Sequence, residues 1–153
     1  MTRIRSLVVF QILVVGGGLA IGYLTSPDGW YANLTKPTFT PPGWLFAPVW
    51  TLLYISIAIT GWRISGWRPK VTSQTAMRLW WAQLVLNFLW SPLFFGLHLT
   101  GVALVVIVLL LITIIFLIVV TWSKDRIVAL LTLPYALWVA FAGVLNGSIV
   151  ALN

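Results

Sequence analysis

The residues best suited to hold a ligand are aromatic side chains and amides that recur at helical spacing. Gln83, Asn87 and Trp90 are spaced i, i+4 and i+7, and Trp50 and Tyr54 are spaced i and i+4. Residues at these spacings share one face of a helix. Indole and phenol rings stack on flat apolar molecules, and a few amides orient such a ligand by hydrogen bonds. The pattern therefore predicts binding of a flat, apolar compound.

A third row of the same kind lies near the end of the sequence. Trp138, Ala142 and Leu145 are spaced i, i+4 and i+7, and Asn146 lies eight residues after Trp138. An amide in an apolar environment needs a hydrogen-bond partner, because an unpaired group costs several kcal/mol. Two interpretations stay open. The amides bridge helices as structural contacts, or they line a cavity among the first, second, third and fifth helices.

The titratable residues argue against several other kinds of site. With no cysteine and one histidine, a thiolate or bis-histidine haem site within one chain is excluded, and we expect no metal site. His98 lies in a turn between helices and is interpreted as a polar cap. Asp28 and Asp125 both lie in loops, so the spans lack the carboxylates typical of coupled transporters. No general acid–base constellation and no obligatory cofactor are predicted.

The composition is that of an integral membrane protein. The 153 residues are 61% hydrophobic and only 7% charged, whereas about a quarter of a soluble domain is charged. The net charge of +7 does not indicate a nucleic-acid partner, because the basic residues lie at the ends of apolar segments. Membrane lipid is the expected surrounding, and no cleavable signal peptide is predicted.

Five apolar segments are long enough to cross a bilayer at about 20 residues per span. We predict one all-α membrane domain over residues 1–153, a five-helix bundle. Pro92 is expected to break or kink its helix, and Pro48 and Pro134 lie near first turns, where proline is tolerated. The predicted helices cover approximately residues 6–25, 43–63, 76–96, 101–122 and 127–152.

The first loop, residues 26–42, is expected to act as a lid. Lys36 to Pro42 contains three prolines and cannot be helical, so it should be stiff and extended with turns. Aromatic residues in and after this loop suit a membrane–water interface. They also suit a flap over a cavity, and both interpretations stay open. These residues are Trp30, Tyr31, Phe39, Trp44 and Phe46.

The positive charges predict the orientation in the membrane. With five spans, the N-terminus, second loop and fourth loop share one side, and the other side carries only Lys36. Because positive residues favour the cytoplasm, we expect a cytoplasmic N-terminus and an outward lid. Helical spans favour a bacterial inner membrane, because proteins that span the outer membrane are usually barrels. The basic residues of the cytoplasmic side are Arg3, Arg5, Arg63, Arg68, Lys70, Arg78, Lys124 and Arg126.

Two pairs of glycines mark sites of close helix approach. Gly18 and Gly22 form a GxxxG pair, and Gly143 and Gly147 form another. Such pairs allow backbones to pack closely, either within one chain or between two copies. The spacing leaves both uses open.

Four blocks of the sequence carry distinctive strings of aromatic, proline and amide residues. The longest block, at 30–54, reads WYANLTKPTFTPPGWLFAPVWTLLY. The others are AQLVLNFLWSPLFFG at 82–96, ALVVI at 103–107 and LPYALWVAFAGVLN at 133–146. In content and order these blocks resemble the TspO family of tryptophan-rich sensory proteins, also called the translocator protein or peripheral benzodiazepine receptor family. Together they span most of the chain.

The resemblance implies a five-helix bundle, often a homodimer, that binds porphyrins and isoquinoline or benzodiazepine drugs under the first loop. It also implies that Trp50 and Trp138 match tryptophans implicated in light-dependent porphyrin breakdown. The Tyr and Lys or Arg of the sterol-binding segment are absent from VLNGSIVALN at 144–153. The implied pocket residues are Tyr31, Pro42, Trp50, Tyr54, Asn87, Trp90, Trp138, Ala142 and Leu145.

Two functions follow as hypotheses. The first is a tetrapyrrole-binding protein for sensing, transport or regulation, in which Lys36 contacts a porphyrin propionate. The second is an enzyme that degrades porphyrin in light through Trp50 and Trp138. A selective channel is disfavoured because the spans offer almost no polar lining. A scaffold without a saturable ligand is the remaining alternative.

Overall fold

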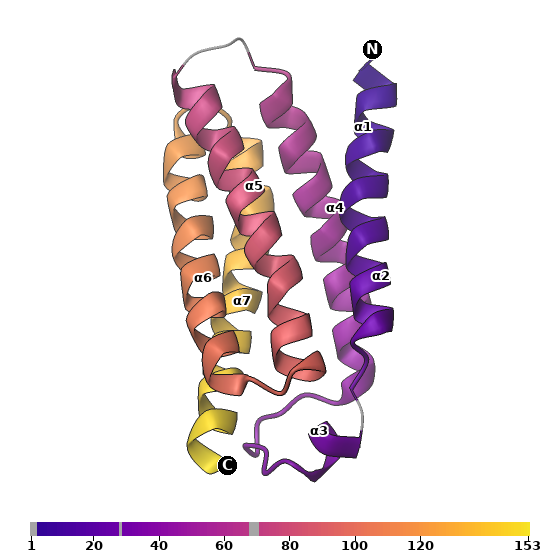
Figure 1. The fold of residues 1–153 in the computed structure, drawn as a ribbon. Coiled ribbons are helices and arrows are strands. Elements are labelled where there is room, and N and C mark those ends of the chain that lie inside the picture. The colour runs from indigo at the N-terminus through magenta and orange to yellow at the C-terminus, as the bar shows by residue number, and fades with distance from the viewer. Residues whose placement is uncertain (1–2, 28, 68–70) are drawn as a thin grey trace.

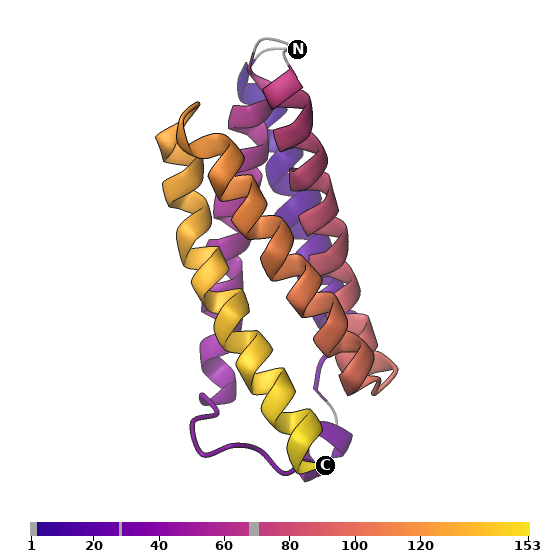
Figure 2. The same ribbon diagram turned by 90° about the vertical axis from the view of Figure 1, so that its left-hand side faces the viewer.

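The computed structural model describes residues 3–27, 29–67 and 71–153. Asp28, Arg68 and Lys70, which the sequence analysis places in loops, lie outside this part. The described residues form long helices lying side by side, without a strand (Figures 1 and 2). In chain order they are α1 (Arg3–Gln11), η1 (Ile12–Gly16), α2 (Gly17–Leu24), α3 (Gly29–Asn33), η2 (Gly43–Leu45), α4 (Phe46–Ser65), α5 (Val71–Ser91), η3 (Pro92–Gly96), α6 (Thr100–Trp122) and α7 (Arg126–Leu152).

Four helical segments of the described chain are long and apolar enough to span a membrane. This confirms the predicted all-α membrane class. The helix α5 is also 21 residues long, but polar residues along it lower its hydropathy, so a count of five spans stays a prediction. The four segments are Arg3–Leu24, Gly43–Ser65, Thr100–Trp122 and Arg126–Leu152.

Several bounds differ from the sequence-based ones. The helix α5 begins at Val71, five residues before the predicted start. Its first turns are polar, so the apolar pattern alone places the start too late. At Pro92 the α-helix changes to the π-helical turn η3. Pro134 lies inside α7. The short helix α3 lies within the first loop, where none was predicted, whereas the segment from Lys36 to Pro42 is non-helical.

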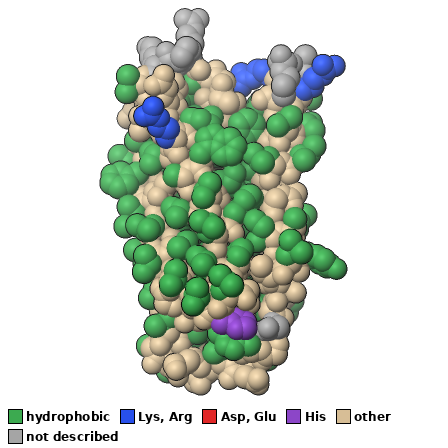
Figure 3. Space-filling model, viewed as in Figure 1, with side chains coloured by type: hydrophobic (Ala, Val, Ile, Leu, Met, Phe, Trp, Pro, Cys, Tyr) green, Lys and Arg blue, Asp and Glu red, His purple; other side chains and the backbone are tan. Residues whose placement is uncertain are grey.

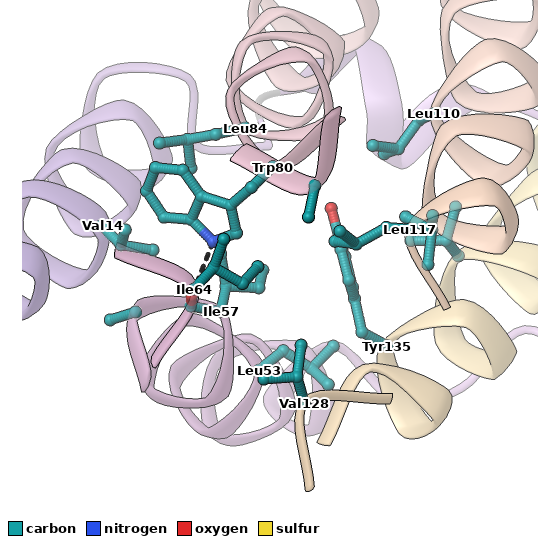
Figure 4. Packing of buried hydrophobic residues seen from close by; sticks show 14 of the residues in the cluster. Val14, Leu53, Ile57, Ile64, Trp80, Leu84, Leu110, Leu117, Val128 and Tyr135 are labelled. Atoms are coloured by element: carbon teal, nitrogen blue, oxygen red, sulfur yellow. Dashed lines mark hydrogen bonds between the residues drawn. The ribbon is translucent and has the colours of Figure 1, made fainter. Parts of the chain in front are cut away.

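The core of the bundle surrounds Trp80 (Figure 4). This side chain is 0% exposed, and its Nε1 donates a hydrogen bond to the Ile57 carbonyl at 2.9 Å. Phe10 meets the indole edge-to-face with 5.2 Å between ring centroids. A Cβ on Gly61 would lie 2.4 Å from the indole Cε2, so only glycine lets α4 approach Trp80 this closely.

The two ends of the bundle differ in charge. One end holds the start of α1, the end of α4, the start of α5 and the α6–α7 connection, and the other end holds the lid and the end of α7 (Figure 1). Lys and Arg side chains gather at the N-terminal end above an apolar band (Figure 3). There Arg63 pairs with Asp125 at 3.0 Å. Asp125 also accepts hydrogen bonds from the amides of Ile127 and Val128, and so caps α7.

Candidate functional site

A cavity of about 580 Å³ lies at the lid end of the bundle. Its wall comes from α2, α4, α5 with η3, α7 and the lid. The volume lies within the range of small-molecule sites, about 300–1,000 Å³. Most of the wall is apolar, and its aromatic members are Tyr23, Tyr31, Phe46, Trp50, Tyr54, Trp90, Phe94, Phe95 and Trp138.

The structure brings all but one of the predicted site residues into this wall. Pro42 is the exception: it is exposed and does not line the cavity, whereas its neighbours Pro41 and Gly43 do. Its backbone is extended and its carbonyl accepts from the Leu45 amide, so Pro42 starts η2. The predicted residues in the wall are Tyr31, Lys36, Trp50, Tyr54, Asn87, Trp90, Trp138, Ala142 and Leu145.

Other lining residues were not anticipated from the sequence. Ser91, Phe94 and Phe95 follow Asn87 by four, seven and eight residues, so the helical spacing that selected Asn87 also indicates them. The α2 residues Gly18, Leu19, Ile21, Gly22 and Tyr23 carry no comparable pattern. Their place in the wall depends on how α2 packs.

A glycine on α2 positions the aromatic pair on α4. A Cβ on Gly18 would lie 2.3 Å from the Tyr54 ring, so the phenol ring rests directly on the α2 backbone. Tyr54 stacks on Trp50, with 5.4 Å between centroids and 30° between planes. Trp50 also meets Tyr135 of α7 edge-to-face at 6.4 Å. Gly18 therefore allows close packing of two helices within one chain. This is one of the two alternatives for the GxxxG pair, the other being a contact between two copies.

Two of the three amides bridge helices. The Asn87 Nδ2 donates to the Tyr135 hydroxyl at 2.9 Å. Asn146 accepts from the Trp90 Nε1 at 3.1 Å and donates to the Thr100 carbonyl at 2.9 Å, which joins α7 to α5 and α6. Gln83 instead donates to a carbonyl of its own helix. Asn87 and Asn146 also line the cavity. Both interpretations of these amides, as contacts between helices and as part of the cavity wall, therefore apply to them.

The cavity wall contains buried polar atoms that lack a partner among the described residues. These are the Oδ1 of Asn87 and the Nε1 of Trp138. One is an acceptor and the other a donor. Buried polar groups are normally hydrogen-bonded, so each atom is one that a ligand or water could satisfy after a small side-chain movement.

Lys36 supplies the positive charge of the described cavity wall. Its Nζ donates to the carbonyls of Ala32 and Leu34 at 3.2 and 3.4 Å and lies 4.6 Å from the centre of the Tyr31 ring. Burial raises the pKa of the Tyr31 phenol, so Tyr31 stays protonated at neutral pH. The ammonium is thus held over the cavity by contacts within the lid.

The lid packs on η3 and the turn that follows it, and is tied to the end of α7. Trp30 stacks on His98 with 4.0 Å between ring centroids, and Tyr31 meets Phe95 edge-to-face at 5.2 Å. His98 has a φ of 58° and does not line the cavity. At the other side, Asn153 accepts from the Thr35 amide at 2.9 Å and donates to its carbonyl at 3.0 Å.

The fold and the site together define a multi-pass α-helical membrane protein with an aromatic cavity under a lid. The chain belongs to the TspO/MBR family, whose pattern it matches over residues 10–152. It is 42% identical over 156 residues to the tryptophan-rich protein TspO of Archaeoglobus fulgidus, covering 99% of both chains. It is 38% identical to the protein CrtK of Rhodobacter capsulatus, over 97% of this chain and 94% of that one. The translocator protein of Bos taurus is 37% identical, over 90% and 83%.

Proposed function

We propose that this protein binds a tetrapyrrole of the protoporphyrin IX type in the aromatic cavity, for sensing, transport or regulation. Benzodiazepine- and isoquinoline-type compounds are expected to occupy the same site. The observation that carries the proposal is the wall itself: Trp50, Tyr54, Trp90 and Trp138 surround about 580 Å³. A porphyrin macrocycle needs such ring faces for stacking.

The lid adds a feature that discriminates among flat ligands. Lys36 is the charged residue of the described wall, so a propionate would replace its contacts with Ala32 and Leu34 by an ion pair. Hydrogen bonds to charged groups contribute about 1.5–3 kcal/mol. Lys36→Ala should therefore weaken protoporphyrin IX about tenfold or more and leave its dimethyl ester unchanged. Equal losses for both porphyrins would refute the propionate contact.

The proposal is tested by titrating the protein in nanodiscs with protoporphyrin IX and following the porphyrin absorbance band. We expect saturation near one porphyrin per chain. The Trp50→Phe/Trp138→Phe variant should bind more weakly. The matched control is Trp81→Phe/Trp122→Phe, because both residues are 44–45% exposed and outside the cavity wall. A non-saturating shift, the same in all three proteins, would mean partition into lipid and would refute the function.

A second candidate function is light-dependent degradation of the bound porphyrin. Trp50 and Trp138 both line the cavity, and the Trp138 Nε1 has no partner among the described residues. Indoles beside an excited porphyrin are positioned to react with it or with oxygen species that it generates. A defined product under illumination, lost in the Trp50→Phe/Trp138→Phe variant but not in Trp81→Phe/Trp122→Phe, would support this function. Bleaching at equal rates would exclude it.

The membrane arrangement is part of the proposal. We expect α5 to span with the other four helical segments, because its polar residues Gln83 and Asn87 are buried in the bundle. The basic N-terminal end should face the cytoplasm of a bacterial inner membrane, and the lid should face outward. A homodimer is expected from the family resemblance. Accessibility labelling of single cysteines and native mass spectrometry test these points separately.

A further inference from the structure

The cavity is not enclosed on every side. Its wall includes the α2 residues Leu19 and Tyr23, which are 56% and 84% exposed on the outside of the bundle. Between them is Gly22, also exposed and also in the wall. Ala47 at the start of α4 is likewise both exposed and in the wall. Residues that are both in the wall and on the outer surface mark an opening.

The packing of the helices explains why the opening is at this place. Both α1 and η1 pack along α4, whereas α2 packs against α5. Gly18 of α2 packs directly on Tyr54 of α4. Beyond it, a Cβ on Gly22 would meet nothing within 4 Å. The opening therefore lies between the end of α2 and the start of α4, next to the lid.

The opening faces lipid. Gly22 and Leu19 precede Leu24, the last residue of α2, by two and five positions, which corresponds to about 3 and 8 Å along the helix. This depth is where headgroups give way to acyl chains in a bilayer about 30 Å thick. The exposed side chains around the opening are apolar or aromatic, as this depth requires.

We propose that the opening beside Gly22 accepts an apolar chain attached to the ligand, so that the site takes a flat ring system bearing a long alkyl or isoprenoid tail. This inference rests on the proposed ring-binding function. The ring system lies among Trp50, Trp90 and Trp138, and the tail leaves between Leu19 and Ala47 to lie among the lipid acyl chains. A ligand larger than the cavity is thereby accommodated without disturbing the lid.

The experiment compares two porphyrin monoesters, methyl and hexadecyl, in nanodiscs. Gly22→Trp fills the opening without a clash at its Cβ, and Gly16→Trp is the matched control, because Gly16 is also exposed, also free of neighbours within 4 Å and outside the wall. We expect Gly22→Trp to weaken the hexadecyl ester about tenfold relative to the methyl ester, as overpacking of a filled site typically does. Gly16→Trp should leave the ratio unchanged.

An unfolding midpoint in mixed SDS micelles equal to that of the wild type shows that Gly22→Trp is folded, and Gly22→Leu provides a smaller step with a smaller expected loss. An unchanged ratio of the two affinities in Gly22→Trp would overturn the tail channel while leaving ring binding intact. Equal weakening of both esters would also overturn it. If neither ester saturates the wild type, the proposed ring-binding function fails instead.

Discussion

The two halves of this bundle use tryptophan in opposite ways. Away from the lid, Trp80 is fully buried, its Nε1 is hydrogen-bonded to Ile57, and Gly61 lies against its ring. Under the lid, Trp138 is half-buried, its Nε1 has no partner among the described residues, and its ring lines the cavity. An indole is structural where the neighbouring helices close around it, and it is available to a ligand where they leave space.

The largest expected effect comes from truncating these two indoles. Trp80→Ala should lower the free energy of unfolding by about 3–5 kcal/mol, the usual cost of removing a fully buried tryptophan. Trp138→Ala should cost less, because part of its ring already borders empty space, and it should weaken porphyrin binding instead. Unfolding in mixed SDS micelles measures the first effect and porphyrin titration the second. Equal stability losses would remove the distinction between the two halves.

A glycine substitution sharpens the same comparison. Gly61→Ala places a Cβ 2.4 Å from the Trp80 ring and should destabilise the protein by about 1–3 kcal/mol through overpacking. Gly22→Ala meets nothing within 4 Å and should be neutral or slightly stabilising, since alanine favours helix over glycine. The same SDS titration measures both. A neutral Gly61→Ala would mean that the core around Trp80 is looser than its packing indicates.

The closed end is also tied by an ion pair and a cap. Asp125→Ala removes both the contact with Arg63 and the acceptor for the first amides of α7. We expect a loss of about 1–2 kcal/mol, mostly from the cap. Arg63→Gln removes only the ion pair, which should contribute about 0–1 kcal/mol because both groups are partly exposed. A larger loss for Arg63→Gln than for Asp125→Ala would contradict this division.

The smallest effect is expected at the lid end, where Asn153 pairs with the backbone of Thr35. These hydrogen bonds are exposed, so Asn153→Ala should change the unfolding free energy by less than about 1 kcal/mol. Loosening the lid should nevertheless speed porphyrin release about threefold, which stopped-flow dissociation measures. Ser148→Ala is the control, because that hydroxyl donates within α7 only. Equal release rates would show that this pair does not hold the lid.

The helices and the lid follow mostly from local sequence. The helix predicted at 101–122 is observed as α6, Thr100–Trp122, because no charged or helix-breaking residue interrupts this apolar run. The first turns of α5 and the short helix α3 were missed, since neither carries an apolar periodicity. Pro42 was expected in the pocket from the family resemblance, yet its extended backbone at the start of η2 leaves it outside.

The candidate site was predictable where its residues share a helical face. Asn87 and Trp90 on α5, and Trp138, Ala142 and Leu145 on α7, all lie in the wall. The first helix is expected in the wall, but the particular α2 residues that line the cavity are not indicated by the sequence, because they are glycines and ordinary apolar residues. The pairing of Trp90 with Asn146 likewise joins residues 56 positions apart.

The sequence by itself determined the membrane class, the approximate helices, the non-helical proline segment from Lys36 to Pro42 and the segregation of positive charge, because hydrophobicity, proline geometry and charge act locally. Only the tertiary structure decided which tryptophan is core and which borders the cavity. That outcome depends on glycines of neighbouring helices, Gly61 beside Trp80 and Gly18 beside Tyr54. The GxxxG spacing of Gly18 indicates a close approach, but which side chain a glycine meets depends on segments distant in the sequence, so the local pattern does not decide it.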